Sequence, residues 1–282
     1  MTAAQELIAS YRSFKTLPHV VTKLSQLIND SNTTMKDFEE VIKMDPTLVV
    51  RLLRLVNSPY YGLSQYIESI GRAVALIGMK NLYNIAVTDA LKHLFREREV
   101  SRIFSRQKLW LHCAAVAICS QMLAERVFGI NGDDAYLCGI LHDFGLIVEE
   151  QAAGAVFYDI CRAALEHGSL PEQERKRLTT DHAEIGYLIT DDWGIPHTIR
   201  EAIRDHHSLR DAIEPTSLTG ILQIAEYLTG QLGYTILAIP VTELSPVLAD
   251  HIQDNIDEYR VLLDDLPAEM SKASEIYRST EH

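Results

Sequence analysis

The side chains of this sequence that could do chemistry are histidines and carboxylates in its second half. His142 and Asp143 are adjacent, at the end of an apolar run that starts at Ala135. Such a pair joins a borderline nitrogen donor to a hard oxygen donor, which suits zinc, iron or manganese. A lone His-Asp dipeptide is weak evidence for a metal site, because metal binding takes three or four such donors. The pair gains weight only if further donors accompany it.

Further donors do lie on both sides of this pair, in apolar helical segments or at helix ends: His112, His182, His206, His207 and Glu226. A site for two metal ions needs about six or seven nitrogen and oxygen donors, with one carboxylate able to bridge. Taken singly, His112 fits a core histidine bonded to a backbone carbonyl, and Glu226 fits an exposed acid. Adjacent His206 and His207 would repel each other when protonated. The set as a whole favours a metal centre.

The elements that must position these donors are helices. Nearly every segment has apolar side chains at helical spacing, and almost none alternates with the period of a strand, which predicts an all-α fold. The helices expected in the second half cover about residues 106–128, a segment with His142 and Asp143, and residues 155–167, 182–194, 196–207 and 218–228. Residues 172–177 form a polar stretch after a break at Pro171. Ser245-Pro246 and Pro267 are each expected to open a terminal helix.

The first half carries signals for helix starts and ends. These are Leu17-Pro18, a capping box of Thr34 and Asp37, Asp45-Pro46, Asn57-Ser58-Pro59, Ser69 and Gly78. A charged run over residues 96–106 marks the junction between the halves. We therefore expect an N-terminal helical subdomain (residues 1–100), a helical subdomain that holds the donors (101–235) and a C-terminal helical extension (236–282).

Composition limits the class of protein. The 282 residues are 47% hydrophobic, enough for a sizeable core, and the formal net charge is −13. An acidic surface repels phosphate backbones, so we expect no direct binding to nucleic acid. The four cysteines lie in apolar patterns without a paired motif, as in a reduced cytosolic protein. With no signal peptide and no span for a membrane, the sequence predicts a cytoplasmic protein that does not bind membranes.

The order of the donors resembles that of the HD superfamily of metal-dependent phosphohydrolases. The segments Leu141-His142-Asp143-Phe144-Gly145 and Trp193-Gly194-Ile195-Pro196, the latter followed by the histidine pair, are similar to its bacterial HDOD branch (HD-related output domain). The first half agrees, over Asp45–Gly62 and Ser69–Gly78. The resemblance covers about residues 14–230. It implies a multi-helix fold in which an N-terminal helical subdomain packs on an HD-like helical bundle.

The resemblance also implies a ligand set. His112, His142, Asp143 and Glu226 would hold one divalent ion. His182, His206 and His207 would hold a second ion, with Asp143 as the bridge and the candidate catalytic residue. One or two ions of iron, manganese or zinc are expected, and magnesium is a further candidate. In catalytic relatives, a metal-bound hydroxide attacks phosphorus.

Three departures from the catalytic pattern matter. Where relatives that cleave cyclic di-GMP place a phosphate-binding lysine, this chain has Leu146, and residues 208–212 lack the glycine-rich loop of those enzymes. Both differences argue against cleavage of cyclic di-GMP. Lys108 replaces an acid that some relatives use for a third metal, and Glu226 replaces the usual aspartate. Lys108 and Arg204, together with Arg200, are candidates for binding phosphate instead.

Two functions from different classes follow from these observations. The first is a signalling or regulatory output module that works through a partner protein or a small phosphorylated ligand. Asn57, Tyr60 and Tyr61 would then offer an interaction surface, although helix packing explains this turn equally simply. The alternative is a phosphohydrolase that acts on a nucleotide or another small phosphate ester. The sequence makes no prediction of oligomeric state.

Overall fold

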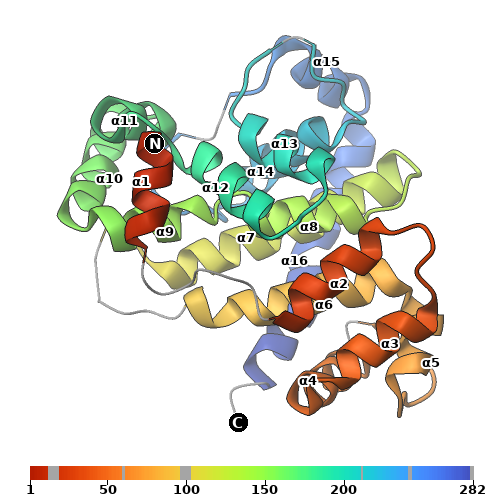
Figure 1. Cartoon of the computed structure of the whole chain (residues 1–282). Helices are drawn as coiled ribbons and strands as arrows, with labels where there is room; N and C mark the ends of the chain where they lie inside the picture. The colour runs from red at the N-terminus through yellow and green to blue at the C-terminus, as the bar shows by residue number, and fades with distance from the viewer. Residues whose placement is uncertain (12–18, 59–60, 96–102, 211, 241–242, 280–282) are drawn as a thin grey trace. The chain divides into compact units, whose positions relative to one another are not determined.

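The computed structural model of the chain describes residues 1–11, 19–58, 61–95, 103–210, 212–240 and 243–279. Throughout these residues the secondary structure is helical, without a strand, so the predicted all-α class is confirmed (Figure 1). None of the helices in these ranges is long and apolar enough to cross a membrane. The start signal Leu17-Pro18, the pair Pro59-Tyr60 and most of the expected junction (residues 96–102) lie outside the described residues.

The helices gather into two compact units. The larger unit combines residues 1–15 with 94–266, and the smaller unit combines residues 16–93 with 267–282. Residues at the N-terminus, expected in the first subdomain, form α1 (Ala3–Ser10), which packs against two helices of the larger unit. Residues 236–266 of the expected C-terminal extension also belong to the larger unit.

The smaller unit contains α2 (His19–Asn29), α3 (Met35–Lys43), α4 (Pro46–Val56), α5 (Ile70–Ile77) and α6 (Met79–Lys92). The side chains of Thr34, Asp45 and Ser69 accept hydrogen bonds at the starts of α3, α4 and α5, as the sequence predicts. Buried apolar side chains from each of these helices form its core: Leu24, Phe38, Ile42, Leu52, Val74 and Leu82. Local caps and apolar stripes therefore define this unit.

Asn57 fixes the turn that follows α4. Its side-chain amide donates to the carbonyls of Leu53 and Ile67, both at 2.8 Å, and its Oδ1 accepts from the Ile67 amide at 2.7 Å. The hydroxyl of Tyr61 donates to Asn81 at 3.2 Å. Both side chains are therefore engaged inside the smaller unit, which favours the packing interpretation of this turn.

The larger unit contains α1, the 3₁₀ turn η1 (His93–Phe95) from its second residue on, α7 (Arg106–Met122), the π-helical turn η2 (Leu123–Val127), α8 (Asp133–Leu141), α9 (Gly145–Ala153), α10 (Ala155–His167), α11 (Leu170–Leu178), α12 (His182–Asp192), α13 (His197–Asp205), α14 (Leu218–Gln231), α15 (Pro246–Asp254) and the first part of α16 (Ile256–Ser279). Helix α7 is buried along most of its length, and α8 and α14 pack against it. Helices α12 and α13 pack on each other and on α9 and α8, respectively (Figure 1).

Two predicted elements are corrected by the structure. The polar stretch over residues 172–177 belongs to helix α11, because Pro171 lies in the first turn of that helix, where proline is tolerated, and Gln173 and Glu174 are buried. Pro267 lies inside α16 instead of opening a helix. The helix continues there because its buried apolar side chains keep one face on both sides of the proline: Tyr259, Leu262, Leu266 and Met270.

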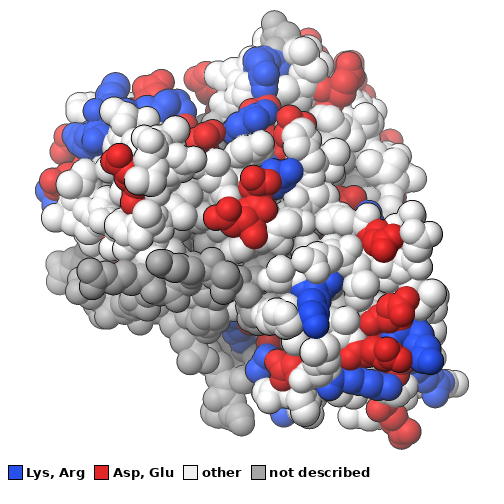
Figure 2. All heavy atoms as spheres, in the orientation of Figure 1, with Lys and Arg blue, Asp and Glu red and all other residues white. Residues whose placement is uncertain are grey.

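Charged side chains of both signs share the surface. On the face shown in Figure 2, acidic and basic groups of the described residues are interspersed. Some of them are neighbours on a helix, such as Lys43 and Glu39 of α3, whose charged atoms are 2.5 Å apart. Pairs of this kind are worth only about 0.3–0.5 kcal/mol each, so the fold depends on its core and caps.

Candidate metal centre

A close helix contact brings the first two histidines together. Gly139 of α8 lies against α7, where a Cβ atom on Gly139 would come within 2.8 Å of the Val116 carbonyl carbon and still closer to the Ala117 backbone. Only glycine allows the two backbones to approach this far. As a result His112 of α7 and His142, which directly follows α8 as its C-cap, have their Nε2 atoms 3.2 Å apart.

The His-Asp pair lies in a turn, which corrects the expectation of a helix. Helix α8 ends at Leu141 and α9 begins at Gly145, so Asp143 lies between them. Gly145 in turn contacts the backbone of His182, and a Cβ there would lie 2.8 Å from the His182 Cα. The glycine therefore lets the turn reach α12, so the Asp143 side chain can meet both His142, just after α8, and His182 of α12.

Site 1 consists of His112, His142 and Asp143. Oδ2 of Asp143 is 3.3 Å from the Nε2 atom of His112 and 3.2 Å from that of His142. All three residues are buried. Three donor atoms from a helix, a helix end and a turn thus converge on one point.

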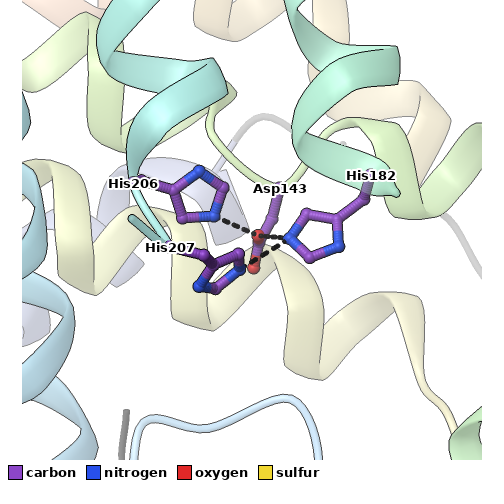
Figure 3. Close-up of side chains that lie close together, drawn as sticks. All are labelled: Asp143, His182, His206 and His207. Atoms are coloured by element: carbon purple, nitrogen blue, oxygen red, sulfur yellow. Dashed lines mark hydrogen bonds and ion pairs between the residues drawn. The ribbon is translucent and has the colours of Figure 1, made fainter. Parts of the chain in front are cut away.

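Site 2 consists of Asp143, His182, His206 and His207. Figure 3 shows the three imidazoles around the aspartate, with His206 and His207 on one side and His182 on the other. Oδ1 of Asp143 is 3.2 Å from Nε2 of His182 and 3.6 Å from Nε2 of His206. The donor atoms of site 2 all lie within 4.8 Å of one another. Asp143 therefore offers one oxygen to each site, the arrangement of a bridging carboxylate.

The outer nitrogens of four of the five imidazoles bond to the protein. The Nδ1 atoms of His112, His142 and His206 lie 2.7, 2.9 and 2.6 Å from the backbone carbonyls of Tyr234, Gly139 and Ile203. Nδ1 of His182 lies 2.7 Å from Glu174, a fully buried acid on α11. A hydrogen bond at Nδ1 fixes the tautomer and leaves the Nε2 lone pair for a metal.

Electrostatics keep the centre ready for a cation. Burial alone would raise the pKa of Asp143, but the charge of His142 and hydrogen bonds from the surrounding histidines hold it well below its usual range. Burial, with the charges of His206 and His182, lowers the pKa of His207 well below its ordinary value. Burial would lower the pKa of His112 too, yet Asp143 raises it. The aspartate is therefore ionised and His207 is neutral, the forms that bind metals. Burial would lower the pKa of His182, but Glu174 and Asp143 raise it well above its ordinary value, so a metal ion bound there would displace a proton.

The donor set fits divalent metal ions on the evidence of its own contacts. Nε2 of His182 and Nε2 of His207 are 2.9 Å apart, a distance at which a shared proton or a common metal ion must hold the two nitrogens together. Nε2 of His206 is buried and forms no hydrogen bond with any residue that the structure describes. Nitrogen-rich donor sets with a bridging carboxylate suit iron, manganese or zinc better than magnesium. Metal ions would satisfy all of these nitrogen atoms together.

Other residues singled out from the sequence lie farther from the donors. Glu226 of α14 lines the same cavity as His112 and contributes to its raised pKa, but it belongs to neither site among the described residues. Lys108 is exposed and Arg204 is bonded to Asp205, and neither lines the described part of the cavity. Arg200 is paired with Asp191.

A cavity of about 530 Å³ opens over the two sites. Asp143 and three of the histidines form part of its wall, and Arg175 of α11 also lines it. Arg175 and Glu174 are the residues that sequence reasoning missed, because their segment was taken for a break between helices. One signal could have pointed to Arg175. Asp181 is the N-cap of α12, and Arg175, six residues earlier, bonds to its side chain.

Comparison with known proteins identifies the family. The model of the HDOD domain matches residues 14–209. The chain belongs to the HDOD family. An uncharacterized protein of Treponema pallidum (strain Nichols) is 26% identical over 205 residues, which is 70% of this chain. The chain spans only 38% of the length of that curated relative.

Solved structures share the HDOD fold. A candidate phosphohydrolase from Shewanella amazonensis SB2B is 25% identical, with a TM-score of 0.67 over 96% of this chain and 94% of that one. An HDOD domain protein of unknown function from Geobacter sulfurreducens is 22% identical, with a TM-score of 0.68 over 94% of this chain and 97% of that one. A candidate signal-transduction protein from Marinobacter aquaeolei VT8 has a TM-score of 0.72 at 20% identity, covering 96% of this chain and 65% of that one.

Proposed function

We propose that this chain is a regulatory output module of the HDOD family in which sites 1 and 2 hold two divalent metal ions and bind a small phosphorylated ligand. One observation carries the proposal. Asp143 presents its two oxygens to two separate groups of buried imidazoles, beneath a cavity of about 530 Å³. A buried carboxylate among five imidazoles is costly unless protons or a cation balance its charge. Metal ions would do so at both of its oxygens, which supports metal binding over a purely structural cluster.

The residues of the chain divide the work of binding. His112, His142, His182, His206 and His207 would hold the ions, which supply positive charge for phosphoryl oxygens. Glu174 keeps His182 oriented through Nδ1. Arg175 gives the cavity a planar cation that suits phosphate. This division accounts for a phosphate site without the lysine whose place is taken by Leu146.

A signalling role is supported by the family and by one description of a structural relative. The Marinobacter aquaeolei relative is named as a candidate signal-transduction protein. We propose that occupancy of the cavity by a phosphorylated ligand is the input, and that the output passes to a partner signalling protein. The acidic composition makes nucleic acid a poor partner.

Hydrolysis of a small phosphate ester is the second candidate function. The name of the Shewanella amazonensis relative, a candidate phosphohydrolase, points the same way. The lining of the cavity supports hydrolysis as well, because it includes Asp143, neutral His207 and Arg175. Those groups could orient an ester and a water molecule near one another. Turnover would add to ligand binding and would not replace it.

Metal analysis of the untagged protein tests the proposal. We expect close to two equivalents of iron, manganese or zinc by plasma mass spectrometry, and a loss of at least half of it in His142→Ala, which removes a donor from site 1. His197→Ala is the matched control, because His197 is an exposed histidine paired with Glu201 on α13. Protein that holds no metal even after reconstitution, or His142→Ala protein with full occupancy, would refute the proposal.

A further inference from the structure

The cavity above the metal centre has an uneven lining that bears on its ligand. Apart from the metal-site residues, its wall is largely apolar and comes from four separate segments: Leu146, Leu170, Leu209, Ile236, Leu237 and Ile239. Leu209 is 54% exposed, and Ile236 and Ile239 are half-buried, so these three side chains present apolar surface, whereas Leu146, Leu170 and Leu237 are buried. This much apolar surface around one opening is typical of small-molecule sites, and about 530 Å³ is within the usual range of roughly 300–1,000 Å³.

Charge in the cavity is equally uneven. Arg175 is the one lysine or arginine among the described residues that line it, whereas Glu172, Glu226 and Glu243 join Asp143 as acids. One N–H group of Arg175 is bonded to Asp181, and a guanidinium carries five. A single arginine beside two metal ions can neutralise one phosphoryl group. The acids would repel the additional charges of a diphosphate or triphosphate.

We propose that the cavity selects a compound with one phosphoryl group and an apolar substituent, and that it discriminates against polyphosphates. This inference rests on the proposed function, because the phosphoryl group is placed at the metal centre. The phosphoryl group lies over sites 1 and 2 beside Arg175. The substituent lies against the apolar wall, which ends at the loop of Ile236 and Ile239.

The loop that carries Ile236 also contacts the metal centre. Tyr234 lies two residues before Ile236, and its carbonyl oxygen is 2.7 Å from Nδ1 of His112. Part of the apolar wall and a donor of site 1 are therefore held by the same short segment. A substituent that packs on Ile236 would be positioned directly relative to His112, so binding of its two ends is expected to be cooperative.

Calorimetry with zinc-loaded protein tests the inference. The probes are methyl-, butyl- and hexylphosphonate, which cannot be hydrolysed, together with inorganic phosphate and dilute pyrophosphate. Burial of each methylene should increase affinity by up to about fourfold, so hexylphosphonate should bind at least about tenfold more tightly than methylphosphonate. Pyrophosphate should bind no more tightly than phosphate.

Two variants separate the ends of the ligand. Ile236→Ser should flatten the dependence of phosphonate affinity on chain length, so that hexylphosphonate loses most of its advantage over methylphosphonate. Leu232→Ser is its control, since Leu232 is an exposed leucine nearby that does not line the described cavity. Arg175→Gln should weaken all the phosphonates by a similar factor. The N-cap of α12 survives this change, because Asp181 uses its other oxygen for the Glu184 amide.

The outcomes distinguish this inference from the proposed function. Equal affinity across the phosphonates, or pyrophosphate as the tightest probe, would overturn the inference. If phosphate still bound and required His142 in that case, the proposed function would stand. If neither phosphate nor any phosphonate bound the zinc-loaded protein, both would fall.

Discussion

Behind His182, two buried acids lie in succession away from the metal centre. Glu174 bonds to His182, and Glu149 of α9, which is fully buried, has no hydrogen bond from any described residue to either oxygen. Burial, reinforced by the charge of Glu174, raises the pKa of Glu149 well above its ordinary value. The folded protein therefore favours the neutral carboxyl form of Glu149.

This predicts a pH-dependent stability that one substitution removes. At pH values between the pKa of Glu149 in the unfolded chain and its raised pKa in the folded protein, the folded protein holds a proton on Glu149 that the unfolded chain has released. The contribution of Glu149 is therefore fully present at acidic pH and is lost as the pH rises, by up to about 1.4 kcal/mol per pH unit. Glu149→Gln, which is neutral and similar in shape, should remove this slope and stabilise the protein at pH 8.

Denaturant unfolding at several pH values, compared between the wild type and Glu149→Gln, measures this slope. Glu166→Gln serves as the control, because Glu166 is an exposed acid on α10. Identical pH profiles for the wild type and Glu149→Gln would show that Glu149 is ionised in the folded protein.

At the scale of elements, the approach of α8 to α7 sets the geometry of site 1. Gly139→Ala should push the helices apart, because its methyl group would overlap the backbone of Ala117. We expect a loss of about 1–3 kcal/mol of stability, together with weaker metal binding, since His142 would move away from His112. Gly71→Ala is the control, because its methyl group would meet only the flexible end of Glu39. Metal affinity equal to that of the wild type in Gly139→Ala would contradict this account.

The start of α7 is tied to α9 by a buried ion pair. Nε of Arg106 lies 2.7 Å from Glu150, another N–H group donates to the Leu94 carbonyl, and the hydroxyl of Tyr158 donates to Glu150. Glu150→Ala should cost about 1.5–3 kcal/mol, because it removes the carboxylate that binds both Arg106 and Tyr158. The double variant Arg106→Met/Glu150→Leu should recover most of this loss in denaturant unfolding. If Glu150→Ala cost less than about 1 kcal/mol, water would have to reach Arg106.

Across the whole molecule, signals that act over a few residues could be predicted from the sequence. The caps at Thr34, Asp45, Ser69 and Asp181 depend on a side chain and an amide two or three residues away, and the structure has all four. The common centre of the donors could also be predicted, because the types of the donor residues and their order along the chain are visible in the sequence itself. Features set by distant contacts were not predictable.

Helix α11 and the turn at Asp143 illustrate this limit. The polar sequence of α11 resembles a loop until Glu174 is seen buried against His182, eight residues on in sequence but on another helix. The turn depends on Gly145 meeting the backbone of His182, a contact that no local pattern encodes. Arg175 and its cavity were missed with the helix that carries them. Tertiary packing thus decided the finer structure of the site.

Metal binding should also stabilise the molecule as a whole. The donors come from α7, α12, the end of α8 and the turns after α8 and α13, so ions bound to them would join elements that are far apart in the sequence. A ligand present at 100 times its dissociation constant stabilises the folded state by about 2.7 kcal/mol. The midpoint of thermal unfolding should therefore be several degrees higher in zinc-loaded than in chelator-treated protein, and it should rise further with zinc concentration.

Two variants test whether this shift comes from the metal centre. Asp143→Asn lacks the bridging charge and should show little of the shift. Asp191→Asn, which changes an exposed aspartate on α12, should show all of it. An equal shift in Asp143→Asn would mean that zinc stabilises the protein from some other site.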